Sequence, residues 1–184
     1  RKKKEKRVSA LKSDSLAYRR EVPKNAIRAD TLENIGYGEK TVIVGRIMLA
    51  DNTGKISKLG VFDKLDDKDV IVLERLECNG ASVPVYLEKT PDNVNTVNSL
   101  IHYGDIVSLK GVKTLVDYSD VFLGESIELL SKAVGDVYDS NIDFRKKQNL
   151  YTHRHLQIVR EQDKLSYFRK VSLVLYTIRE TLYQ

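Results

Sequence analysis

Three histidines and one cysteine are the residues of this chain best suited to metal or nucleophilic chemistry, but their spacing argues against it. His153 and His155 stand two residues apart in a stretch that predicts a helix. Helical positions with this spacing point to different faces, so the two rings would not share a metal ion. Cys78 precedes Asn79-Gly80 in a predicted turn, and His102 stands alone. We therefore expect no metal site.

Other catalytic signatures are missing from the sequence as well. The chain has no Gly-x-x-x-x-Gly-Lys-Ser/Thr phosphate loop and no Gly-x-Ser-x-Gly nucleophile elbow. Its carboxylates are scattered without a spacing typical of an acid/base pair. We therefore expect no catalytic residue in these 184 residues. The single cysteine excludes an internal disulfide and fits a reducing compartment. No apolar run approaches the roughly 18 residues of a spanning helix, so no membrane segment is expected.

The net charge of +5 is unevenly distributed along the chain. Residues 1–7 hold six basic residues and one acidic residue, and residues 143–184 hold nine basic and four acidic ones. Residues 8–142 carry 16 basic and 21 acidic residues, so the body is acidic. Lysine and arginine supply most of the affinity for polyphosphates. The first segment is therefore either a solubilising tail or an arm that contacts a nucleic-acid phosphate backbone through Lys2, Lys3, Lys4, Lys6 and Arg7.

The middle of the chain predicts five strands and one helix. Strands are expected at 41–50, 70–76, 83–87, 104–111 and, in two pieces, 120–123 and 126–130, because these runs are rich in β-branched residues. Asn79-Gly80 predicts a hairpin between the second and third strands, and Gly45 predicts a bend or bulge in the first. A helix is expected to begin at Pro91. A helix between strands three and four is the order of an OB-fold barrel.

The predicted fold is therefore mainly β with helical flanks. A basic arm and lead-in occupy residues 1–40, and a five-stranded OB-fold barrel occupies 41–134, with an insertion at 51–69. A helical segment follows at 135–184. From Leu165 its apolar positions recur at steps of three or four residues, which predicts an amphipathic helix that needs a partner surface.

Two groups of motifs carry a resemblance to a known family. One contains Gly104-Asp-Ile-Val-Ser-Leu-Lys-Gly111 and Leu129-Leu-Ser-Lys-Ala133. The other is a C-terminal pattern formed by Arg154, Leu156, Ile158, Phe168, Ser172, Ile178, Arg179 and Leu182, from which His155 and Gln157 depart. Together they resemble the anticodon-binding domain of class II lysyl-tRNA synthetases and the start of the catalytic domain.

This resemblance implies tRNA as the partner and lysine–tRNA ligation as the activity of the parent protein. It also implies ATP and Mg²⁺ as the parent's cofactors, a homodimeric parent and a cytoplasmic location. The family's catalytic motifs would lie beyond Gln184, so we expect the 184 residues to contain no cofactor site and to be inactive alone. Aspartyl- and asparaginyl-tRNA synthetases share the architecture and stay open as alternatives. A non-catalytic OB module for single-stranded nucleic acid and a protein-interaction scaffold also stay open.

The resemblance also assigns the anticodon-binding positions. The family reads a U-rich anticodon with an aromatic residue on the second strand, a Gln on the third and a Glu near the fifth, which correspond here to Ile71, Pro84 and Tyr118. All three residues differ from the family's residue types, whereas Arg46 on the first strand is the same residue as in the family. Slipping the alignment by one residue gives Val70 or Val72 and recovers no aromatic residue. Either the chain reads its anticodon with substituted side chains, or the barrel has kept only backbone or protein contacts. The aromatic residues near predicted loops are expected to be core or cover residues: Phe62, Tyr86, Tyr118 and Phe122.

Overall fold

A computed structural model describes residues 22–49, 59–65, 67–78, 81–133, 137–138 and 142–183. The chain divides into two compact units, Arg1–Asp136 and Val137–Gln184. Among the described residues, no helix is long and apolar enough to cross a membrane. The predicted arm at residues 1–7 lies outside the described residues.

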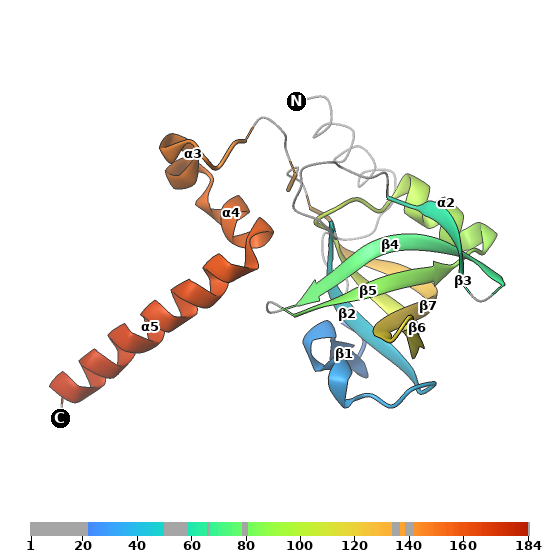
Figure 1. Ribbon diagram of the computed structural model, residues 1–184, viewed down its shortest axis with the longest axis horizontal. Helices are drawn as coiled ribbons and strands as arrows, with labels where there is room; N and C mark the ends of the chain where they lie inside the picture. The colour runs from blue at the N-terminus through green and yellow to red at the C-terminus, as the bar shows by residue number, and fades with distance from the viewer. Residues whose placement is uncertain are drawn as a thin grey trace. The chain divides into compact units, whose positions relative to one another are not determined.

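The first unit is mainly β, as predicted (Figure 1). Its strands are β1 (Ala26–Arg28), β2 (Lys40–Met48), β3 (Val61–Leu65), β4 (Lys68–Cys78), β5 (Ala81–Glu88), β6 (Ile106–Val116) and β7 (Ser119–Ser131). A 3₁₀ helix, η1 (Ala29–Asn34), follows β1, and helix α2 (Pro91–Ser99) lies between β5 and β6.

These strands form one mixed sheet in the order β1-β2-β6-β7-β5-β4-β3, with an additional pairing between β2 and β4. The β1–β2 and β5–β7 pairs are parallel, and the other pairs are antiparallel. The pairing path that leaves β2 through β6, β7, β5 and β4 therefore returns to β2.

Local sequence explains most of these elements. Strand β4 pairs with β5 across the predicted hairpin, which confirms the pairing of Val70–Leu76 with Val83–Leu87; Asn79 and Gly80 themselves lie outside the described residues. Helix α2 begins at the predicted Pro91, a residue that fits the first helical position because its missing N–H is not needed there. The Thr90 side chain caps this helix by accepting the Asn93 backbone N–H at 3.2 Å.

Several features of the sheet differ from the sequence prediction or add to it. Strand β1 and the 3₁₀ helix η1 lie in the predicted lead-in, where no strand was expected, and the two predicted pieces after residue 120 form the single strand β7. Strand β3 occupies part of the predicted insertion and pairs with β4. Gly45 introduces no register shift in the β2–β6 ladder. A Cβ at this position would lie 2.7 Å from Leu76 Cγ and 2.9 Å from the Glu77 carbonyl oxygen, so Gly45 instead allows β4 to approach β2.

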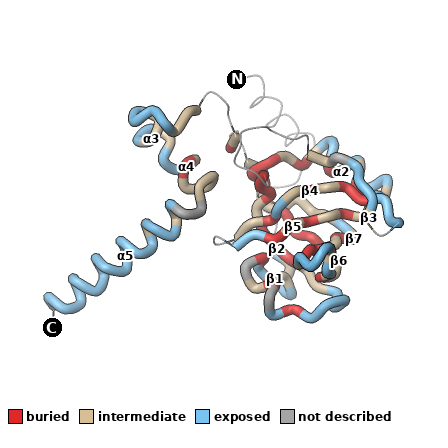
Figure 2. The backbone as a smooth tube through the Cα atoms, viewed as in Figure 1, coloured by how far each residue is buried: buried red, intermediate tan, exposed pale blue. Residues whose placement is uncertain are grey.

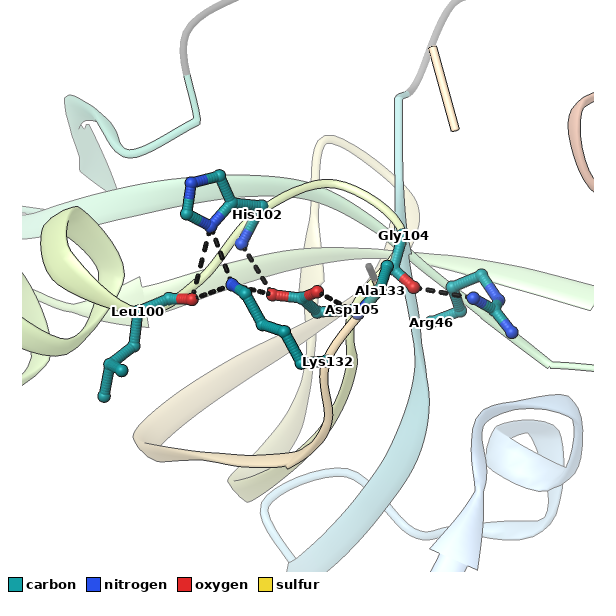
Figure 3. A network of polar contacts seen from close by, with 7 residues as sticks. All are labelled: Arg46, Leu100, His102, Gly104, Asp105, Lys132 and Ala133. Atoms are coloured by element: carbon teal, nitrogen blue, oxygen red, sulfur yellow. Dashed lines mark hydrogen bonds and ion pairs between the residues drawn. The ribbon is translucent and has the colours of Figure 1, made fainter. Parts of the chain in front are cut away.

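Most of the buried residues of the unit are apolar, and Figure 2 shows that burial is concentrated in the strands. An ion pair whose two side chains are both buried lies among them (Figure 3). The Asp105 side chain is 0% exposed and that of Lys132 is 2% exposed, and Lys132 Nζ donates to Asp105 Oδ2 at 2.7 Å. The same ammonium lies 2.7 Å from His102 Nδ1 and donates to the Leu100 carbonyl at the end of α2. Asp105 also accepts the backbone N–H groups of His102 at 2.8 Å and Ala133 at 2.7 Å. The pair therefore joins the end of α2, the start of β6 and the end of β7.

The second unit is helical. It contains α3 (Lys147–Thr152), α4 (Arg154–Arg160) and α5 (Gln162–Leu182), and α5 includes the predicted amphipathic helix. The Arg160 guanidinium lies 5.6 Å from the Tyr138 ring centre and 5.0 Å from that of Phe144, and it donates to the Val137 carbonyl. Helix α5 is exposed along most of its length (Figure 2). Its exposed large apolar residues include Val171, Leu173, Val174, Leu175, Ile178 and Leu182.

We expect Asp105→Ala to lower the free energy of unfolding by about 3–5 kcal/mol, because it leaves the Lys132 ammonium buried without its counter-charge. Urea titrations followed by circular dichroism would measure the change. The matched control is Lys68→Ala, which breaks the exposed 3.6 Å ion pair with Glu88 and should cost less than about 1 kcal/mol. An equal effect of the two substitutions would contradict a structural role for the buried pair.

Candidate nucleic-acid interface

The candidate interface includes the outer face of β2, β4 and β5, which is the side of these strands that points away from the core. Side chains alternate along β5, where Val83, Val85 and Leu87 are buried and Pro84 and Tyr86 are half-buried. Paired residues of neighbouring strands share a face. Pro84 is paired with the exposed Arg75, and Tyr86 is paired with Val72. The outer face therefore presents an arginine and a tyrosine on adjacent strands.

A β-bulge in β4 determines which residues reach this face. Val72 pairs with Tyr86 and Glu74 pairs with Val85, so Leu73 and Glu74 together lie opposite one residue. Glu74 has a φ of 67°, which is uncommon for a residue other than glycine. Its Oε1 accepts the hydroxyl hydrogen of Tyr103 at 3.2 Å. Beyond the bulge, Arg75 faces outward and Leu76 is buried.

The structure places the four predicted anticodon-binding residues in different environments. Arg46 is half-buried on β2, and its Nη1 donates to the Gly104 carbonyl at 2.6 Å (Figure 3). Ile71 is 1% exposed and packs in the interior, so its side chain does not reach a surface ligand. The outward position beside it on β4 is Val72. Pro84 lies on the outer face, and Tyr118 is 98% exposed. The basic tail that was predicted to contact the tRNA backbone, Lys2, Lys3, Lys4, Lys6 and Arg7, lies outside the described residues.

Arg46 and Tyr118 lie near opposite ends of β6 and do not form one compact site. Arg46 is paired with Ile106 at the start of β6, whereas Tyr118 follows Val116 at its end. Ten residues of strand separate the two positions, which corresponds to about 30 Å. A ligand that touched both side chains would have to be extended.

Tyr118 lies in a turn that is unusual for a bulky residue. Asp117 and Tyr118 connect β6 to β7 with φ values of 48° and 61°. Positive φ at both central positions is the geometry of a type I′ hairpin turn, which favours Asn, Asp and Gly. The conformation costs on the order of 1–3 kcal/mol, and the exposed ring recovers none of this through burial. The expectation that Tyr118 covers the core is therefore wrong. Phe62 is 51% exposed, whereas Phe122 is a core residue as expected.

A polar clasp holds the base of this hairpin. The Tyr37 hydroxyl donates to Asp120 Oδ1 at 2.7 Å, and Lys113 Nζ lies 3.0 Å from Asp120 Oδ2 and 4.8 Å from the Tyr37 ring centre. The hydrogen bond from the Tyr37 hydroxyl is the main cause that lowers the pKa of Asp120 below its ordinary value, and the hydrogen bond from Lys113 is the next largest. The bond to Asp120 raises the pKa of the Tyr37 hydroxyl.

Sequence reasoning missed the outward arginines Arg28 and Arg75 and treated Tyr86 as a core or cover residue. The signal for Arg75 is weak, because Val70-Ile-Val-Leu73 is apolar throughout and gives no alternation from which to identify the outer face. The signal for Tyr86 is clearer, because polar Ser82 and apolar Val83 begin a regular alternation in β5. Arg28 had no signal, because β1 was not predicted.

Among the described residues, no group of three or more His, Cys, Asp or Glu side chains could hold a metal ion. The rings of His153 and His155 lie 6.3 Å apart between centroids and are tilted by 57°. Neither a protein-family model nor a curated protein sequence significantly matches this chain.

Tyr37→Phe should raise the pKa of Asp120 toward its ordinary value of about 3.9, because it removes the hydroxyl and keeps the ring over Lys113. A lowered carboxyl pKa stabilises the fold above the unfolded-state pKa, and this contribution is lost as the pH falls through the folded-state pKa. Acid unfolding of the variant should therefore begin at a higher pH. An NMR titration of the Asp120 carboxyl carbon would test this, with Tyr118→Phe as the control in the same hairpin. An unchanged Asp120 titration would exclude the clasp in solution.

Proposed function

We propose that β2, β4, β5, β6 and β7 are the five strands of an OB-fold barrel that binds single-stranded RNA. The observation that carries this proposal is the pairing path that returns to β2, with α2 inserted between the third and fourth of these strands. OB-folds are partly open five-stranded barrels that bind oligonucleotides on the face of the second and third strands, here β4 and β5.

Side chains on this face suit an unpaired RNA strand. Proteins recognise such strands by stacking bases on aromatic rings and by placing cations beside phosphates. Tyr86 and Arg75 lie on the β4–β5 face, and Tyr118 lies in the loop between the fourth and fifth barrel strands. OB-folds also use that loop to bind ligands.

We further propose that the parent protein is a class II lysine–tRNA ligase and that this barrel is its anticodon-binding domain. The two barrel motifs that resemble the family most closely are joined by the buried ion pair, because Asp105 belongs to one and Lys132 to the other. This contact gives a physical reason for both motifs to persist in one fold. The catalytic domain of the parent, rather than this barrel, would bind ATP and Mg²⁺ and carry out the ligation.

A protein-interaction scaffold is the second candidate, and two observations favour it. The body is acidic, and α5 exposes a long apolar surface. A scaffold barrel would bind U-rich and scrambled RNA loops equally weakly. RNA binding with a sequence preference therefore separates the two functions.

Arg46→Ala should reduce the preference for a U-rich anticodon stem-loop over a scrambled loop by about 1–3 kcal/mol if the guanidinium contacts a base edge. Filter-binding titrations of both RNAs at a fixed salt concentration would measure this. A circular dichroism spectrum would establish that the variant keeps its fold without the Gly104 hydrogen bond. If the preference survives the substitution, or if the unmodified chain has none, the barrel is not an anticodon reader.

Tyr118→Ala should weaken binding of the same stem-loop by about 1–3 kcal/mol, the contribution of one base stacked on an aromatic ring. Tyr118→Phe keeps the ring and should bind like the unmodified chain, so it is the matched control. Since the side chain is 98% exposed, its removal leaves no cavity that would unfold the domain. Equal binding by the Ala and Phe variants would exclude stacking on Tyr118.

A further inference from the structure

Arginine and lysine differ in their pairing within the first unit. Five of its described lysines form ion pairs with carboxylates: Lys40, Lys68, Lys89, Lys113 and Lys132. The described part of this unit contains three arginines, Arg28, Arg46 and Arg75, and none of them forms an ion pair with another described residue. In an acidic body, three arginines without a carboxylate partner need an explanation.

Strand register places these three arginines on neighbouring positions of the outer face. Arg28 on β1 is in register with Val44 of β2, and Arg75 on β4 is in register with Met48 of β2. Arg46 lies midway between these two β2 positions and is therefore diagonal to both other arginines. Diagonal neighbours lie about 7–8 Å apart. The whole line extends about 13 Å along β2, because four residues of strand separate Val44 from Met48.

Among the residues that the structure describes, one carboxylate lies within this line. Glu77 is paired with Arg46 across the β2–β4 ladder. It forms no ion pair with Arg46, whose Nη1 donates to the Gly104 carbonyl, and Glu77 has other contacts of its own. With three guanidinium groups and one carboxylate, the line carries a net positive charge on a body that is otherwise acidic.

The bulge in β4 gives a second, independent indication of function. It holds Glu74 at a φ of 67°, a conformation that costs on the order of 1 kcal/mol or more for a residue with a side chain. Its effect is to direct Arg75 outward, opposite Pro84, where the charge has no carboxylate partner. Bulges are frequent beside functional sites, where they redirect a side chain. The strain and the exposed arginine have a common explanation if Arg75 binds an anion.

We infer that Arg28 and Arg75 bind phosphates of a single RNA strand that runs along β2, on either side of the base that Arg46 contacts. This inference rests on the proposed function. The planar guanidinium fork matches two phosphate oxygens, and arginine is more weakly hydrated than lysine. Phosphate groups carry no sequence information, so Arg28 and Arg75 position the strand, whereas Arg46 and the rings of Tyr86 and Tyr118 are left to contact its bases.

Arg75→Gln and Arg28→Gln would test the line, with Lys64→Gln on β3 as the control that also removes one exposed charge. Fluorescence anisotropy of a labelled U-rich stem-loop, repeated over a series of salt concentrations, gives both the affinity and its salt dependence. Each arginine substitution should reduce the slope of log K against log salt by about one unit, and the control should leave the slope unchanged. A scrambled loop should lose affinity by the same factor.

Arg75→Lys adds a test of the guanidinium group itself, because it keeps the charge and removes the planar fork. Its salt slope should match that of the unmodified chain while its affinity is lower. Suppose that the unmodified chain binds RNA and that Arg75→Gln and Arg28→Gln both keep its full slope and affinity. The arginine line is then overturned, and the proposed function stands. If the unmodified chain binds neither RNA, both are overturned.

Discussion

The fold of the first unit depends on the buried ion pair between Lys132 and Asp105. Removing two charges from water is costly, and their attraction offsets that cost only when nearly all of their hydrogen-bonding capacity is used. Here the Lys132 ammonium contacts Asp105, His102 and the Leu100 carbonyl, and Asp105 accepts two further backbone N–H groups. Any other relative position of α2, β6 and β7 would leave a charge buried without a partner. The pair therefore fixes one arrangement of three consecutive elements through two residues that are 27 positions apart.

Strand β2 is attached to the same point through its backbone. The Ile47 N–H donates to the Asp105 carbonyl at 2.9 Å, and the Gly104 N–H donates to the Ile47 carbonyl at 2.8 Å. Arg46, the neighbour of Ile47, donates to Gly104 from its side chain. The network that closes the interior thus also positions the central arginine of the outer face. Stability and the candidate binding surface share residues 104 and 105.

Sequence patterns predicted the elements better than their faces. The β-branched runs, Asn79-Gly80 and Pro91 act over a few residues, so they identified β2, the β4–β5 hairpin and α2 correctly. The orientation of β4 could not be predicted, because Val70 to Leu73 are all apolar and the outer face depends on a bulge stabilised by the distant Tyr103. The candidate site was only partly predictable for a related reason. The net charge summed over residues 8–142 is negative. This sum does not show which lysines and arginines are paired with carboxylates, because the pairing depends on the three-dimensional structure.

The bulge also has a consequence for how chains of this kind can change in length. Val72 faces Tyr86 and Arg75 faces Pro84, with two residues between them on β4 and one on β5. A β4 with one residue fewer at positions 73–74 would therefore make the same two pairings in a regular ladder. Elsewhere in the strand, a single deletion would exchange the inner and outer faces of everything beyond it. An alignment of related sequences should therefore allow a one-residue gap within β4 only at positions 73–74. Without that gap, the alignment would match core positions of one chain with surface positions of another.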